Sequence, residues 1–125
     1  MSTLHITHTP SGHVVINRAQ HIAALNDDMR RNPFGLGKRT VVTRKLHHMG
    51  AEFIANVLRN VANYSDFNVS NNSHGERDFG TFRIDNHDIA FKIDYYDVDG
   101  IYGSEDPSDP AQTLRVMTLM FLSEY

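Results

Sequence analysis

The segment from Phe82 to Tyr96 alternates apolar and polar residues on both sides of a short polar turn. This pattern restricts the possible folds more than any other feature of the sequence. Phe82 and Ile84 alternate with polar neighbours before the turn at Asp85–Asp88. After the turn, apolar side chains recur at every second position, namely at Ile89, Phe91, Ile93 and Tyr95. Successive side chains of a strand point to opposite faces, so the segment predicts an antiparallel hairpin with one buried face.

Two segments before the hairpin have helical periodicity. The first begins at Asn17, a favourable N-cap, and ends before Pro33, because proline cannot continue the backbone hydrogen bonding of a helix. We expect Asp27 and Asp28 to be exposed on this helix. The second segment carries apolar residues at every third or fourth position from Leu46 to Tyr64, which predicts one amphipathic helix lying on the core.

The rest of the chain supplies further strands. Thr40–Thr43 is β-branched throughout and predicts a short strand. Residues 114–122 are compatible with a helix that starts at Asp109-Pro110 or with a strand buried on both faces, and we favour a short turn followed by a strand. Residues 4–16 form either a hairpin or a loose arm. The order of elements predicts a single α+β domain over residues 1–125, with an antiparallel sheet of about four strands and two helices packed on one face.

The composition excludes several classes of site. The chain of 125 residues has no cysteine, so disulfides, thiol catalysis and thiolate zinc sites are absent. It shows no signal-peptide pattern and no apolar run approaching the roughly 20 residues that a membrane span needs. We therefore expect a cytoplasmic protein that does not bind a membrane. The eight histidines show no metal-ligand spacing such as HExxH, so we predict neither a metal nor a cofactor.

The net charge of -3 is the sum of a basic N-terminal half and an acidic C-terminal half of the chain. Residues 1–65 carry eight Lys/Arg against three Asp/Glu, whereas residues 66–125 carry four Lys/Arg against twelve Asp/Glu. Such asymmetry marks a surface for a charged partner, or it is cancelled where the halves fold against each other.

The C-terminal half contains five short sequence motifs: HGERDFG at 74–80, KIDYYD at 92–97, GSEDPSDP at 103–110, RVMT at 115–118 and SEY at 123–125. Through these motifs, in this order, the chain resembles an uncharacterised bacterial family, a domain of unknown function, from about Leu25 to the end. Residues 1–20 lie outside the resemblance. It implies a small α+β domain that is often encoded on plasmids and other mobile elements of proteobacteria, and it implies no reaction. Arg77 departs from the family, which often has histidine there.

Two alternative functions rest on smaller sets of residues. An enzyme or metal-binding protein would be centred on His74, Glu76 and Asp78, whose side chains would share one face if the segment were extended. A nucleic-acid binder would use the basic residues around the first predicted strand, which are Arg30, Arg31, Lys38, Arg39, Arg44 and Lys45. The overall negative charge makes direct nucleic-acid binding the weaker hypothesis.

The acidic segment after the hairpin is the most unusual surface that the sequence predicts. It places carboxylates among tyrosines, at Asp94, Tyr96, Asp97, Asp99, Tyr102, Glu105, Asp106 and Asp109. Tyrosine contributes strongly to binding at interfaces, and an array of carboxylates can meet a basic surface or imitate DNA phosphates. We therefore predict a non-enzymatic protein-interaction module of a mobile genetic element. Its most specific form is an anti-CRISPR or anti-restriction inhibitor that binds the basic surface of a nucleic-acid-handling defence complex.

Overall fold

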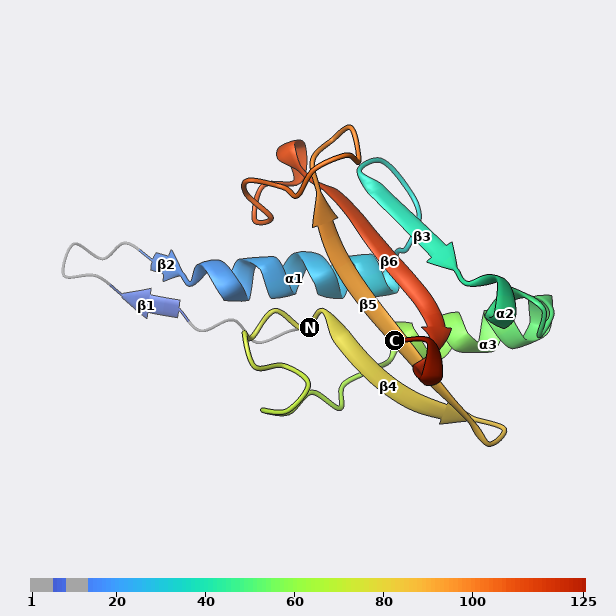
Figure 1. Ribbon diagram of the computed structural model, residues 1–125. Helices are drawn as coiled ribbons and strands as arrows, with labels where there is room; N and C mark the ends of the chain where they lie inside the picture. Colours follow the sequence, from blue (N-terminus) through green and yellow to red (C-terminus); the bar gives the residue numbers. More distant parts are fainter. Residues whose placement is uncertain (1–5, 9–13) are drawn as a thin grey trace.

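A four-stranded sheet backed by two helices forms the body of the protein, as the computed structural model shows (Figure 1). The structure describes residues 6–8 and 14–125. The strands of this sheet are β3 (Lys38–Val42), β4 (Phe79–Ile84), β5 (His87–Tyr96) and β6 (Leu114–Phe121). Both main helices lie behind the sheet on the same face, so the predicted α+β architecture is confirmed.

The order of strands in the sheet is β3-β6-β5-β4, and one pairing departs from the predicted antiparallel arrangement. The β4–β5 hairpin is antiparallel, as predicted, and it turns through Asp85 and Asn86, which both have positive φ. Two such residues are typical of the type I′ turns that match the twist of a hairpin. β5 and β6 are also antiparallel, whereas β3 runs parallel to β6 at the edge of the sheet. The sheet is therefore mixed.

Helix α1 (Arg18–Arg31) has the predicted boundaries. The side chain of Asn17 accepts a hydrogen bond from the backbone N–H of Ala19 at 2.8 Å, and the helix ends just before Pro33. The prediction of one continuous helix from Leu46 to Tyr64 is wrong. The chain forms two helices there, α2 (Arg44–His47) and α3 (Ala51–Ala62). Gly50 separates them with a φ of 96°, a conformation that favours glycine and breaks a helix.

The core lies between the helices and one face of the sheet. Its buried side chains come from α1, α2, α3, β4, β5 and β6, and they are Met29, Leu46, Val57, Val61, Ile84, Ile89, Phe91, Ile93, Met117, Leu119 and Phe121. Burying one such side chain stabilises a protein by about 2 kcal/mol. Gly80 on β4 leaves room for the rings of Phe91 and Tyr64, since a Cβ at this position would lie 2.5 Å from both rings.

The C-terminal segment crosses the opposite face of the sheet. After β6 the chain forms the short 3-10 helix η2 (Leu122–Glu124), and the ring of Tyr125 lies 4.8 Å from the ring of Phe79 on β4. The carboxylate of Glu124 accepts hydrogen bonds from the hydroxyl of Thr43 and the backbone N–H of Phe121, both at 2.9 Å. These contacts fix η2 beside the end of β6, where it forms one wall of a hollow described below.

The two remaining expectations concern the ends of the chain. β1 (Ile6–His8) and β2 (Val14–Ile16) pair antiparallel, which favours the hairpin over the loose arm, while residues 9–13 between them lie outside the described residues. The favoured interpretation of residues 114–122 is confirmed, because the 3-10 helix η1 (Pro110–Gln112) precedes β6.

Within residues 6–8 and 14–125, no helix has the length and apolar character needed to cross a membrane.

Candidate functional site

The predicted acidic segment lies at one end of the sheet, where β5 ends and β6 begins (Figure 1). Its outermost part, residues 97–105, is called the acidic tip here. Within it the carboxylate of Asp97 accepts the backbone N–H of Ile101 at 3.0 Å, and the backbone N–H of Asp97 donates to the carbonyl of Tyr102 at 2.7 Å. Gly100 completes the turn with a φ of 71°. The acidic tip is therefore a small closed loop with its own hydrogen bonds.

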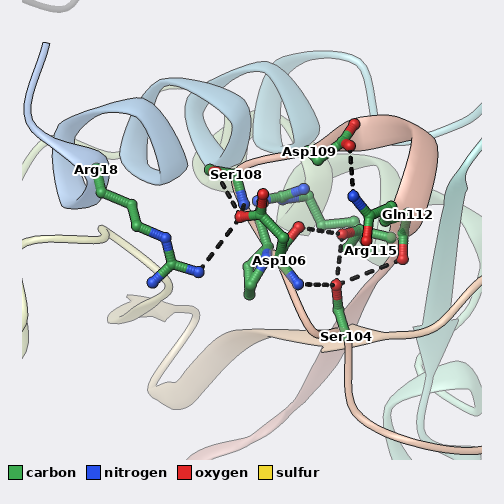
Figure 2. Close-up of polar contacts among 9 residues, drawn as sticks. Arg18, Ser104, Asp106, Ser108, Asp109, Gln112 and Arg115 are labelled. Atoms are coloured by element: carbon green, nitrogen blue, oxygen red, sulfur yellow. Dashed lines mark hydrogen bonds and ion pairs between the residues drawn. The ribbon is translucent and has the colours of Figure 1, made fainter.

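Two of the predicted carboxylates hold the base of this loop (Figure 2). Asp106 accepts hydrogen bonds from the hydroxyl and the backbone N–H of Ser108, and it forms an ion pair with Arg18 at 3.3 Å. The hydrogen bonds from Ser108, followed by Arg18, lower the pKa of Asp106 below its ordinary value. Asp109 is the N-cap of η1 and accepts the side-chain amide of Gln112 at 2.8 Å. These two residues position the loop, and their carboxylates are already engaged.

Three apolar side chains and two of the carboxylates of the acidic tip are exposed. Val98, Ile101 and Tyr102 are 62%, 69% and 74% exposed, which is unusual for large side chains that lie close together in the sequence. Asp99 and Glu105 are exposed and form no hydrogen bond or ion pair with any residue that the structure describes. The tip thus combines three unburied apolar side chains with two unpaired carboxylates.

The other two predicted partner-binding residues lie on the sheet. Asp94 pairs with Lys92 on the same strand at 2.7 Å, and this contact raises the pKa of Lys92. Tyr96 is half-buried at the end of β5, where it forms a bridge with Gly103. The predicted acidic surface is therefore divided into the exposed tip, the engaged base and this pair on the sheet.

The alternative catalytic residues His74, Glu76 and Asp78 lie in a curved loop and do not share one face of a strand. Gly75 and Arg77 both have positive φ, so the segment turns between them. His74 is exposed, while Glu76 accepts a hydrogen bond from the hydroxyl of Tyr95 at 2.8 Å. Burial raises the pKa of Asp78, and the nearby charge of Glu76 raises it further. Among the residues that the structure describes, no group of three His, Cys, Asp or Glu is placed to hold a metal ion.

A buried polar network joins α1 to this loop and to both central strands. Asn26 donates through its side-chain amide to the hydroxyl of Tyr95 at 2.7 Å and to the carbonyl of Glu76 at 3.0 Å. The side chain of Asn26 also accepts the Nε–H of Arg115 at 2.7 Å, and Arg115 donates to the carbonyl of Pro107 at 2.6 Å. Burial lowers the pKa of Arg115 and raises that of Tyr95. The network attaches the base of the acidic loop to the core.

Asp27 is the centre of a second buried polar cluster, which corrects the expectation that Asp27 is exposed. Its carboxylate accepts two hydrogen bonds from Arg77, at 2.6 Å and 3.0 Å, and a further one from Arg30. Arg30 is buried beside the ring of Phe67, and burial lowers its pKa. Asp28, by contrast, is exposed as predicted, and its hydrogen bond with Lys38 lowers its pKa.

The six basic residues of the nucleic-acid hypothesis are dispersed. Arg30 is buried, and Lys38 is engaged by Asp28 at 2.8 Å. Arg39 lies near Gly100 beside the acidic loop, whereas Arg31 is exposed at the end of α1. Arg44 and Lys45 are exposed on α2, at the opposite end of the sheet from the acidic tip. The structure therefore brings only the last two together as neighbours on one exposed helix.

The comparisons with known proteins place the chain in a family. A family model described as a protein of unknown function, DUF3768, matches residues 42–124, about two thirds of the sequence. The chain belongs to the DUF3768 family. The DUF3768 match includes the acidic tip, the loop at 74–78 and strands β4 to β6, while α1 and β3 up to residue 41 precede it. No curated protein and no solved structure matched the chain.

The sequence did not predict the polar contacts among Asn26, Tyr95 and Arg115 that connect these DUF3768 elements. Their positions carried a signal. Asn26 lies four residues after the buried Ile22, on the core side of α1, and Arg115 lies two residues before the buried Met117 on β6. A polar residue in phase with an apolar face is costly to bury unless it is hydrogen-bonded, so such positions predict a network.

Proposed function

We propose that the protein is an interaction module that binds another protein through its acidic tip, residues 97–105. The observation that carries this proposal is the exposure of Val98, Ile101 and Tyr102 on a loop that hydrogen bonds hold in one conformation. Exposed apolar side chains cost a protein solubility, and a clustered group of them is typical of a binding surface. Tyrosine is among the residues that contribute most to binding at protein interfaces.

The chemistry of the tip defines the surface that it fits. A shallow hollow of about 410 Å³ lies beside it, lined in part by Val98, Tyr102 and Glu105. The complementary partner offers an apolar projection or pocket for these groups and basic side chains for the carboxylates of Asp99 and Glu105. Charge complementarity of this kind guides association and selects the partner, while the apolar contacts supply most of the affinity.

Rigidity of the loop favours binding as well. A flexible loop loses conformational entropy when a partner orders it, at about 1 kcal/mol for each immobilised side chain. Here Asp97, Asp106 and Asp109 already fix the backbone, and Arg115 attaches it to the core. The carboxylates engaged in this way are therefore part of the binding site through the shape that they maintain.

The most specific form of the proposal is an anti-defence inhibitor encoded by a mobile element. In this form the acidic tip occupies the basic surface of a nucleic-acid-handling defence complex, such as a CRISPR effector or a restriction enzyme. Asp99 and Glu105 would take the place of phosphates, and Tyr102 would add apolar contact. The features that support this form are the unpaired carboxylates and the resemblance to a family often carried on mobile elements.

The experiment uses a tip variant, Asp99→Asn/Tyr102→Ala/Glu105→Gln, and a matched control, Asp66→Asn/Val69→Ala, which changes exposed residues of another loop. Tagged proteins capture partners from a host lysate, and hydrogen exchange of the purified complex locates the contact. We expect a partner that protects the amides of residues 97–105, that high salt releases, and that binds the control but not the tip variant. A partner retained equally by the tip variant would refute the proposed site.

A further inference from the structure

A second site lies at the opposite end of the sheet from the acidic tip. A hollow of about 630 Å³ opens between α2, the β4–β5 turn and η2, and it is lined by Lys45, Met49, Asn86, His87, Asp88, Phe121, Leu122 and Ser123. Its volume falls within the range of roughly 300–1,000 Å³ that small-molecule sites occupy. This hollow is called the α2 hollow here, and all of its lining residues lie within the segment that matches the family.

The surface of the α2 hollow is largely apolar and aromatic. The ring of His87 lies 5.6 Å from the ring of Phe121, and Phe121 is the last residue of β6. Met49 and Leu122 are each 37% exposed at the rim. The walls are fixed, because the tight turn through Asn86 holds one side and the hydrogen bonds of Glu124 hold η2 on the other.

The charge available in the α2 hollow is positive. The Nζ of Lys45 lies 5.5 Å from the centre of the Phe121 ring, and Lys45 forms no ion pair with any residue among 6–8 and 14–125. The acidic residue of the wall, Asp88, is paired with Arg83 at 2.9 Å. Arg44 and His47 are exposed on the same short helix as Lys45.

We propose that the α2 hollow binds a small amphipathic anion, with an aromatic or short aliphatic body and a single carboxylate, sulfonate or phosphate group. The body lies against Phe121, Met49 and Leu122, where it displaces water from apolar surface. The anionic group meets the ammonium of Lys45, which the face of the Phe121 ring already holds in place. The site is separate from the proposed interaction function, since the length of β6 places it about 25 Å from the acidic tip.

The test titrates the full chain with anilinonaphthalene sulfonate, an aromatic anion whose fluorescence rises in apolar surroundings. Phenylnaphthylamine serves as the matched neutral probe, because it has the same rings and no sulfonate. Lys45→Met removes the ammonium but keeps an unbranched apolar side chain, and Arg59→Met removes an exposed cation from α3 as the control. Amide chemical shifts show that each variant is folded and where the probe binds.

We expect the sulfonate to shift the amides of residues 86–88 and 121–123. Lys45→Met should weaken its binding about fivefold, as the loss of one partly exposed charge contact does, while binding of the neutral probe stays the same. Arg59→Met should bind both probes as the unmodified chain does. Equal affinity of Lys45→Met for the sulfonate, shifts confined to other residues, or no binding up to about 1 mM would each overturn the proposal. None of these results bears on the acidic tip, whose test uses different residues.

Discussion

Replacement of Asp27 by asparagine should destabilise the protein far more than the same replacement at its neighbour Asp28. The side chain of Asp27 is only 4% exposed and accepts hydrogen bonds from Arg77 and from Arg30, which is 2% exposed. Without the carboxylate, the guanidinium of Arg30 keeps the carbonyl of Tyr64 as an acceptor, and its Nε–H already lacks a partner among the residues that the structure describes. Breaking a buried ion pair by removing one member costs about 3–5 kcal/mol, because the other charge stays buried.

Asp28→Asn is the matched control, since it makes the same chemical change one residue along the same helix. Its side chain is 54% exposed and pairs with Lys38 at the surface, where such pairs contribute less than about 1 kcal/mol. Urea unfolding followed by circular dichroism suits a chain that has no tryptophan. The change in midpoint at constant slope gives the free energy of unfolding. Raised salt should reduce the effect of Asp28→Asn and leave that of Asp27→Asn unchanged.

The reasoning would be refuted if Asp27→Asn lost no more free energy of unfolding than Asp28→Asn. A domain of this size is stable by only about 5–15 kcal/mol, so Asp27→Asn could unfold completely. A second, milder variant then still allows a free energy of unfolding to be measured. Arg77→Gln removes the more exposed of the two arginines, whose side chain is 22% exposed. It should cost about 1–3 kcal/mol and keep the buried pair of Asp27 and Arg30. Asp27→Asn and Arg77→Gln therefore rank the contacts of the Asp27 carboxylate by burial, and Asp28→Asn supplies the exposed reference.

Two further predictions concern single residues. Burial raises the pKa of Asp78 in the folded state above its ordinary value of 3.8, so the folded state binds this proton more tightly and ionisation of Asp78 opposes folding. The stability of Asp78→Asn relative to the unmodified chain should then increase as the pH rises from below 3.8 towards neutrality, and urea unfolding over a pH series measures this change. Gly80→Ala should cost about 2 kcal/mol, since the added methyl group overlaps Phe91 and Tyr64, whereas Gly103→Ala has space and should change the melting temperature little.

Periodicity was sufficient to predict most of the fold, because it reports which side chains are buried. The alternation from Ile89 to Tyr95 gave β5, and the boundaries of α1 followed from Asn17 and Pro33. Periodicity did not reveal the break at Gly50, since the apolar residues on both sides remain in phase with one helix. Only the backbone conformation of Gly50 separates α2 from α3, and conformational freedom is a property of a residue that apolar spacing does not report.

The candidate site was harder to predict, because its parts meet only through the tertiary structure. The acidic tip could be identified from composition, and the structure places Val98 and Ile101 beside its carboxylates, although neither residue was predicted to take part. The network of Asn26, Tyr95 and Arg115 joins residues up to 89 positions apart in the sequence. Composition shows that such polar residues exist, whereas their mutual distances depend on how α1 crosses the sheet.

The direction of β3 determines how charge is distributed over the molecule. β3 runs parallel to β6, so it begins beside Arg115 at the acidic end and carries the chain to α2 at the other end. With β3 antiparallel to β6, as the wholly antiparallel prediction required, α2 would lie at the acidic end and Lys45 would neutralise the tip. The parallel pairing instead keeps the carboxylates of the tip and the ammonium of Lys45 about 25 Å apart, beyond the screening length of roughly 8 Å at physiological salt. The two proposed sites can therefore act independently, because the charge of one is not sensed at the other.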